Sequence, residues 1–374
     1  MELPSLLGEE QELLFQSAVR LLRERRGAEP ADLWQAIAGI GWLELCLPPA
    51  LGGPAHGVLS AATLAEAFGA AGVQAPLVAA LLAAWLLRDA GDAAAQAGLL
   101  QAMAAGRALV VPAIMDAPGK EPARCLKTDS ARRLTGETLF VEYGAAADLL
   151  LVSAAPGADE AEPAFFLVPR EGKGVQVEPM PSAGGEYLAA VRFDGVTAPE
   201  PLATGAAVSV GLRRLSLHGA ALRAAELAGI GRTALELTVQ YVQTRMQFGR
   251  PIGSFQAVQH HCADMLRDLV ATRLLVAQAA WRLQEELPAE REVAMAKAKA
   301  SEAIPALLRQ AHQVTGGVGY YRDYPLEGFY RRALDAAASF GGPLEHRRAL
   351  AGLAAQRPAA LRRPDGPHPH PLSQ

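Results

Sequence analysis

The sequence predicts an α+β protein built of an N-terminal helical domain, a middle β domain and a C-terminal bundle of helices. Ala- and Leu-rich helical segments fill residues 1–105, short apolar runs separated by Gly, Pro and Asp fill 106–205, and helical spacing returns over 206–357. A chain of 374 residues is long enough for two or three domains around a sizeable core. We expect the domain boundaries to lie near residues 105 and 205.

The first two domains differ in the residues that interrupt their apolar runs. In the helical part, "PPALGGPAHG" at 48–57 and the surroundings of Gly91 separate the helices. In the middle part, "ALVVPAIM", "LFVEYG", "DLLLVSA", "AFFLVPR" and "AAVRFDGVTAP" follow one another between turn residues. Short apolar runs bounded in this way are typical of strands, so we expect a β domain here.

In the third domain, two apolar stripes step along the chain by three and four residues. The first consists of Leu227, Ile230, Ala234, Leu237 and Tyr241, and the second of Phe255, Val258, Cys262, Met265 and Leu269. Each stripe predicts one buried helix face, and the short turn between them makes the two helices antiparallel neighbours. The Pro- and His-rich residues 358–374 are predicted to form a disordered tail, in preference to a metal site at His368 and His370.

Composition and charge argue against several classes of function. The chain is 51% apolar and 20% charged, with a formal net charge of −4, so no basic excess indicates nucleic acid or an anionic membrane as a partner. No apolar run reaches the ~18 residues that a membrane span needs. The acidic N-terminus lacks the basic start of a signal peptide. Cys46, Cys125 and Cys262 form no CxxC pair, so we expect a reduced, cytoplasmic setting.

Two long segments, "YVQTRMQFGRPIGSFQAVQHHCADM" (241–265) and "QVTGGVGYYRDYPLEGFYRRA" (313–333), resemble the acyl-CoA dehydrogenase family. The resemblance covers nearly the whole chain, because "GIGWLELCLPPALGG" and "AAVRFDGVTAP" are similar to the family's N-terminal loop and to the end of its β domain. It implies a middle β-barrel or sandwich and a C-terminal four-helix bundle. It also implies FAD as the cofactor and an acyl-CoA thioester as the substrate.

In the family, the Arg-x-x-Phe-Gly corner of one subunit reaches the FAD diphosphate of its neighbour. By position, the implied FAD contacts are Arg245, Gln247, Phe248, Phe255 and Gln256 in the first segment and Gln313, Gly316 and Gly317 in the second. A diphosphate needs a fixed cation and close backbone approach, which Arg and Gly supply. The alternative is local: Arg245 would cap a helix C-terminus, and Gly249 would end that helix.

The part of the site that holds a subunit's own flavin departs from the family. The segment "PAIMDAPGKEP" at 112–122 keeps little of the usual Thr-Glu-Pro-x-x-Gly-Ser-Asp. The strand that usually covers the flavin ring corresponds to "FVE", where Phe140 could still stack on the ring. Glu142 would place a negative charge near a flavin that becomes anionic on reduction, or else it would simply face solvent.

The general base of α,β-dehydrogenation is also missing. A carboxylate must remove the α-proton of the thioester, and in many members it is the Glu of a Tyr-Glu-Gly turn. The corresponding "ASFGGPLEH" (338–346) places Gly341 at that position, or Phe340 after a one-residue slip. The other position used in the family falls on Gly219. His218 is a weak substitute, since a lone His on an apolar helix is usually packed.

Two functions therefore remain open. The first is an acyl-CoA dehydrogenase-type oxidoreductase, active alone or only within an assembly. The second is a non-catalytic structural subunit that completes the FAD site of a catalytic relative. Both predict a homo-oligomer (dimer or tetramer) or a hetero-oligomer with a related subunit. An electron-transfer flavoprotein is the usual electron acceptor of the family.

Overall fold

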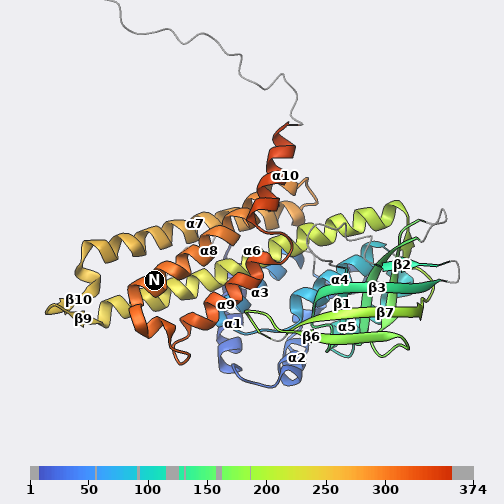
Figure 1. The fold of residues 1–374 in the computed structure, drawn as a ribbon, viewed down its shortest axis with the longest axis horizontal. Coiled ribbons are helices and arrows are strands. Elements are labelled where there is room, and N and C mark those ends of the chain that lie inside the picture. The colour runs from blue at the N-terminus through green and yellow to red at the C-terminus, as the bar shows by residue number, and fades with distance from the viewer. Residues whose placement is uncertain are drawn as a thin grey trace, which may run out of the picture.

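The computed structural model describes residues 8–54, 57–90, 93–114, 126–129, 132–156, 162–185 and 187–355. Within these ranges the expected order of helices, strands and helices is confirmed (Figure 1). The boundaries near residues 105 and 205 stay predictions; the helix α5 ends at Ala104 and α6 begins at Ala206. The predicted tail with His368 and His370 lies outside the described residues, as do Gly91, Cys125 and most of "PAIMDAPGKEP".

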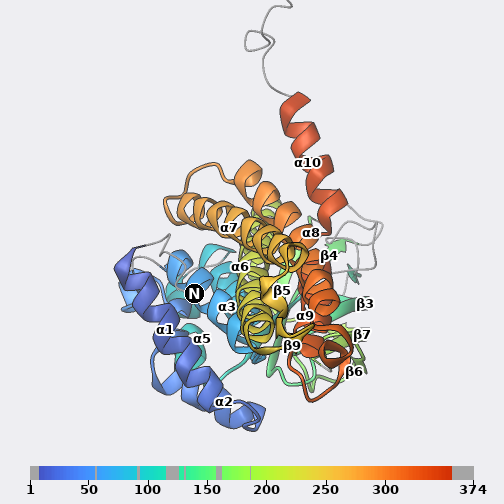
Figure 2. The ribbon, with the colours of Figure 1, turned by 90° about the vertical axis from the view of Figure 1, so that its left-hand side faces the viewer.

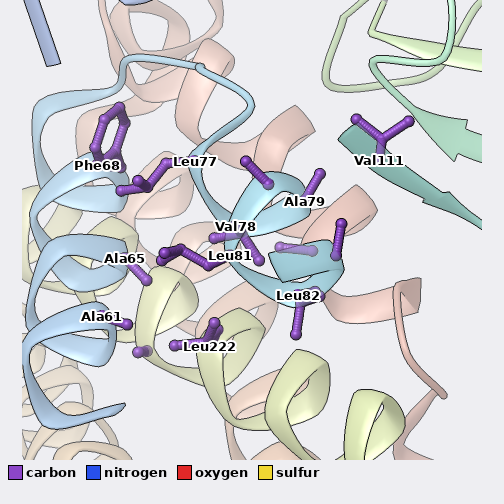
Figure 3. Packing of buried hydrophobic residues seen from close by; sticks show 14 of the residues in the cluster. Ala61, Ala65, Phe68, Leu77, Val78, Ala79, Leu81, Leu82, Val111 and Leu222 are labelled. Atoms are coloured by element: carbon purple, nitrogen blue, oxygen red, sulfur yellow. The ribbon is translucent and has the colours of Figure 1, made fainter. Parts of the chain in front are cut away.

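The N-terminal helices pack against the long helix α6 (Ala206–Thr244). They are α1 (Glu9–Glu24), α2 (Pro30–Gly39), α3 (Gly57–Ala71), α4 (Leu77–Ala90) and α5 (Ala93–Ala104), with short 3₁₀ turns η1 (Trp42–Cys46) and η2 (Pro49–Leu51). Close approach of α3 to α6 requires glycine, because a Cβ on Gly69 would lie 2.1 Å from the Glu226 carbonyl oxygen. A Cβ on Gly229 would lie 1.8 Å from the Glu66 carbonyl oxygen. Figure 3 shows Ala61 and Ala65 of α3 beside Leu222 of α6 and Leu81 of α4.

The middle domain is one eight-stranded sheet with the strand order β6-β7-β3-β2-β4-β5-β8, in which β1 pairs in parallel with β4. The strands are β1 (Val110–Ala113), β2 (Leu126–Thr128), β3 (Arg133–Glu142), β4 (Leu149–Pro156), β5 (Ala164–Pro169), β6 (Val175–Met180), β7 (Leu188–Thr197) and β8 (Ala203–Thr204). The β3–β7 register shifts between Thr138 and Val141, where Phe140 has a positive φ of 57°. This irregularity bends β3 just before it reaches the helices.

The C-terminal helices form an antiparallel bundle. After α6 come the hairpin β9 (Met246–Gln247) and β10 (Arg250–Pro251), η4 (Ile252–Ser254), α7 (Gln256–Gln284), α8 (Glu290–Thr315), η5 (Gly316–Tyr320), α9 (Leu326–Ala338) and α10 (Pro343–Ala355). The predicted pairing of α6 with α7 is confirmed. Met265 and Leu269 are buried, but Phe255, Val258 and Cys262 are only half-buried, so the start of α7 is poorly covered.

A single apolar core joins the three domains, running from α1 through α3, α4 and the sheet into α6, α8 and α9. Among the described helices, none combines the length and apolar character needed to cross a membrane. In the same ranges no cluster of His, Cys, Asp or Glu has the arrangement of a metal site. The helix α10 projects away from the body of the bundle (Figures 1 and 2), and none of its residues is buried.

Candidate functional site

The corner between α6 and α7 is a tight hairpin at one end of the bundle (Figure 1). Arg245 leaves the helix with extended backbone (φ −73°, ψ 117°), and its carbonyl accepts a hydrogen bond from the Ile252 amide (2.8 Å). Phe248 and Gly249 both have positive φ, 52° and 76°, as a two-residue hairpin turn requires. Arg245 is thus the C-cap residue of α6, as the local alternative expected, but Gly249 turns the hairpin and does not end the helix.

The side chains of this corner are exposed. Arg245 and Gln247 face solvent, and the Arg245 guanidinium has no ion pair or hydrogen bond among the described residues. Phe248 is 89% exposed although it is a large apolar residue in a left-handed conformation. A non-glycine residue held this way commonly marks a functional surface.

Phe255 anchors the hairpin to the start of α7. The Arg250 guanidinium lies 4.1 Å from the centroid of the Phe255 ring, and the Phe248 ring meets it edge-on at 5.9 Å. A cation over an aromatic face is attracted by the ring's quadrupole, so Arg250 is held at the corner. Arg250 was not among the residues predicted from the sequence. Its place directly after Phe248 and Gly249 was the feature that could have indicated it. Gln256 begins α7 and is exposed.

The second motif lies at the same end of the bundle, where α8 gives way to η5 (Figure 2). Gln313 is exposed, and Gly316 has a φ of 63°. Neither Gly316 nor Gly317 has a heavy atom within 4 Å of the position where a Cβ would be, so their backbone is open to a ligand. Tyr324, just beyond, meets Tyr241 of α6 edge-on at 6.5 Å, which joins the two motifs through neighbouring helices.

These residues fit the phosphate-bearing half of a FAD. A free guanidinium at Arg245 and open backbone at Gly249, Gly316 and Gly317 are what a diphosphate needs. They lie at the far end of α6 from the sheet (Figure 1). The corner is therefore placed to reach a neighbouring molecule.

The two positions expected for the general base come together in space. A Cβ on Gly219 of α6 would lie 2.4 Å from Cε1 of Phe340, so the Phe340 ring covers Gly219. Phe340 and Gly341 form the turn after α9, with φ values of 56° and 93°. A Cβ on Gly341 would instead lie 3.0 Å from Nε2 of His346. Neither position carries a carboxylate, and the side chain between them is a phenyl ring.

His218 is packed against the helical domain. Its Nδ1 lies 2.8 Å from the Arg214 carbonyl oxygen, and its ring meets Trp85 edge-on at 5.1 Å. Burial lowers the pKa of His218 below its usual value. This environment favours a neutral, structural imidazole.

The cleft between the sheet and the bundle holds a buried cluster of ion pairs. Arg223 of α6 pairs with both Glu142 of β3 and Glu226, and Arg332 of α9 pairs with Glu226 at 3.1 Å. Ser339 Oγ lies 3.2 Å from a Glu142 oxygen. Glu142, expected near a flavin or in solvent, is thus engaged by the chain's own side chains.

Electrostatics keep this cluster charged. Burial opposes the charged forms, but Arg223 and Arg332 hold the pKa of Glu226 below its usual value. Burial likewise opposes the charge of Arg223, and Glu142 with Glu226 raises the pKa of Arg223 above its usual value. Charges removed from water in this way persist only when they are paired. The sequence reasoning missed the cluster because its members come from distant segments.

The space beside the cluster is small. A cavity of about 30 Å³ borders Tyr143, Tyr187, Arg223 and Arg332, which is room for about one water molecule. The buried Nε of Arg223 and the buried Nε and Nη1 of Arg332 have no partner among the described residues. One water could accept hydrogen bonds from at most two of these three donors. The described residues beside the cluster therefore leave no room for a flavin ring or an acyl chain at this point. Phe140, the predicted ring-stacking residue, is 41% exposed.

Lys297 of α8 fixes the turn that carries Phe340. Its buried ammonium donates to Ser301 Oγ (2.8 Å) and to the carbonyl oxygens of Ala337 (2.9 Å) and Gly341 (3.1 Å). Burial lowers the pKa of Lys297 to about 7. The signal in the sequence was a lysine inside the apolar stripe "VAMAKAKASEA".

The chain belongs to the acyl-CoA dehydrogenase family of oxidoreductases. The family's N-terminal domain matches residues 11–107, and its C-terminal domain matches residues 213–354. The predicted family and fold class are thereby confirmed.

Particular relatives span nearly the whole chain. Acyl-CoA dehydrogenase FadE27 of Mycobacterium tuberculosis is 31% identical over 338 residues, which cover 88% of this chain and 89% of that protein. The solved ChsE4–ChsE5 complex from the same species aligns with a TM-score of 0.82 at 27% identity, covering 96% of this chain and 100% of the matched chain. The Tcur3481–Tcur3483 steroid ACAD aligns with a TM-score of 0.82 at 28% identity, covering 93% of this chain and 98% of that chain.

Proposed function

We propose that this chain takes part in FAD-dependent α,β-dehydrogenation of an acyl-CoA thioester as the non-catalytic subunit of a hetero-oligomer. Its corner around Arg245 completes the FAD site of a related, catalytic subunit. Its own cleft binds neither flavin nor thioester. The observation that carries this proposal is the filled cleft, where Phe340 covers Gly219 and Arg223 engages Glu142.

The contrast between the two halves of the site supports this division of labour. The residues that reach outward are exposed and have a free cation, whereas the inward-facing positions are filled by the chain's own side chains. A general base contributes about 10²–10⁴ in rate, and neither Gly219 nor Phe340 can supply one. Two of the similar solved structures are complexes of two differently named chains, which supports a hetero-oligomer with a related subunit.

Within the assembly, this chain's residues bind and orient the cofactor. FAD, when bound, supplies the hydride acceptor. Arg245 would neutralise the diphosphate, the open backbone at Gly316 and Gly317 would allow its close approach, and the exposed Phe248 ring would exclude water from the contact. The steroid ACAD among the similar structures favours a ring-bearing acyl group as substrate. We further propose that an electron-transfer flavoprotein accepts the electrons from the assembly and that the assembly is cytoplasmic.

Flavin content tests the proposal directly. The chain would be purified alone and after co-expression with a catalytic relative, and FAD per chain measured by absorbance. We expect a colourless lone chain and about one FAD per pair of unlike chains. A lone chain that retains one FAD per copy, and bleaches it on addition of an acyl-CoA, would contradict the proposal.

A further inference from the structure

A groove follows the C-terminal half of α1 and extends to Gln240 of α6, five residues before Arg245 in the chain. It consists of three adjoining cavities of about 400, 290 and 420 Å³. Arg23 and Thr233 line both the first and the second cavity, and Arg26 and Phe329 line both the second and the third. The groove is therefore long and bounded by α1, α6 and α9.

Arginines dominate one wall of the groove. Arg20 and Arg23 lie in α1, about 4.5 Å apart along the helix axis, and Arg26 follows in the turn after the helix ends at Glu24. All three are exposed, and none forms an ion pair within the part of the chain that the structure describes, while the Arg26 guanidinium donates a hydrogen bond to the Ala71 carbonyl oxygen (2.5 Å). The lining holds three acids, of which Glu236 pairs with Arg232 (3.5 Å) and Glu327 pairs with Arg331 (2.9 Å), so that Glu24 alone offsets part of the charge of the three arginines. The groove thus has an excess of unpaired positive charge.

The floor of the groove is apolar. Phe15 and Val19 of α1 lie at one end and Phe329 of α9 at the other, all three largely buried. Leu237 of α6 lies between them and is half-buried. An apolar floor with a charged rim is the form of a groove that receives an amphipathic helix.

We propose that this groove binds an acidic, amphipathic segment of a partner protein. The carboxylates of that segment pair with Arg20, Arg23 and Arg26, and its apolar side chains lie on the floor. Three linked shallow cavities suit an elongated segment better than one compact small molecule, because the cations are spread over the end of α1 and the turn that follows it. The overall net charge of −4 makes a nucleic acid a poor occupant.

A labelled peptide tests the proposal on the full chain. The probe is a fluorescein-labelled helical peptide with Glu on one face and Leu on the other, compared with the same peptide carrying Gln in place of Glu. Fluorescence anisotropy should show the Glu peptide binding about tenfold tighter, with weaker binding at higher salt. The combined Arg20→Gln, Arg23→Gln and Arg26→Gln variant should lose that tenfold advantage.

Two further variants keep the test specific. Arg25→Gln removes the exposed arginine at the C-cap of α1, which lines none of the three cavities, and should change affinity by less than about twofold. Gly328→Leu has open space for its side chain, narrows the third cavity and keeps every arginine, so it should also weaken binding. Equal affinity for the two peptides, equal losses in Arg25→Gln and the triple variant, or no saturable binding would each overturn the proposal.

Discussion

At the scale of single residues, Arg245 is the clearest candidate for cofactor contact. It leaves α6 in an extended conformation, and its guanidinium is free of partners among the described residues. Arg245→Ala should weaken FAD retention in the assembly by about 1.5–3 kcal/mol, roughly ten- to a hundredfold, because one charge-assisted contact is lost. Flavin absorbance after dialysis measures this. The matched control is Arg291→Ala, because Arg291 is exposed and lies at the start of α8, away from Gly316 and Gly317. Equal FAD retention in the two variants would favour a merely local role for Arg245.

Lys297 links stability to pH. Burial lowers the pKa of Lys297 to about 7, whereas an unfolded lysine titrates near 10.4. Between these values the unfolded chain binds the proton and the folded chain does not, so this contribution to stability rises with pH, by up to about 1.4 kcal/mol per unit. Urea unfolding at pH 7, 8 and 9 should show the free energy of unfolding of the wild type rising with pH relative to that of Lys297→Met. Parallel pH dependences would contradict the prediction.

At the scale of elements, the turn after α9 is packed against α6. A Cβ on Gly219 would overlap the Phe340 ring, since the two would be 2.4 Å apart. Gly219→Ala should therefore lower the free energy of unfolding by about 1–3 kcal/mol. Phe340→Ala in the same chain should remove most of that penalty, which a double-mutant cycle in urea measures. Additive losses would mean that the two elements do not touch.

The ion cluster joins strand β3 to helices α6 and α9. Arg223 is the only residue of the described chain that pairs with both Glu142 and Glu226. Arg223→Met leaves two buried carboxylates short of a partner and should cost about 3–5 kcal/mol. Urea unfolding of the variant measures the loss. Arg213, also on α6, forms an exposed ion pair with Glu290 of α8, and Arg213→Met should cost less than about 1 kcal/mol. A loss for Arg223→Met as small as that for Arg213→Met would show the cluster to be dispensable.

At the scale of the whole molecule, patterns local in the chain were the predictable ones. The stripe from Leu227 to Tyr241 predicted α6, and the short segment after it predicted the turn that makes α6 and α7 antiparallel neighbours. Contacts between distant segments were not predictable: Glu142 and Arg223 are 81 residues apart, and nothing local in "FVE" indicates an ion pair. The covering of Gly219 by Phe340 likewise depends on where α9 ends in space. Periodicity reports which face is buried, but not what buries it.

Apolar residues left exposed on the C-terminal bundle predict an oligomer. Leu274 and Trp281, two turns apart on α7, are 51% and 47% exposed, and stable subunit contacts tend to cover such surfaces. We expect at least a dimer by sedimentation at micromolar concentration. Changing both residues to Glu should shift the protein toward monomer, because two charges cannot be buried unpaired. Leu13→Glu, on the N-terminal helix α1 and 67% exposed, should leave the assembly unchanged. A monomeric wild-type chain, or dissociation by Leu13→Glu alone, would place the contact elsewhere.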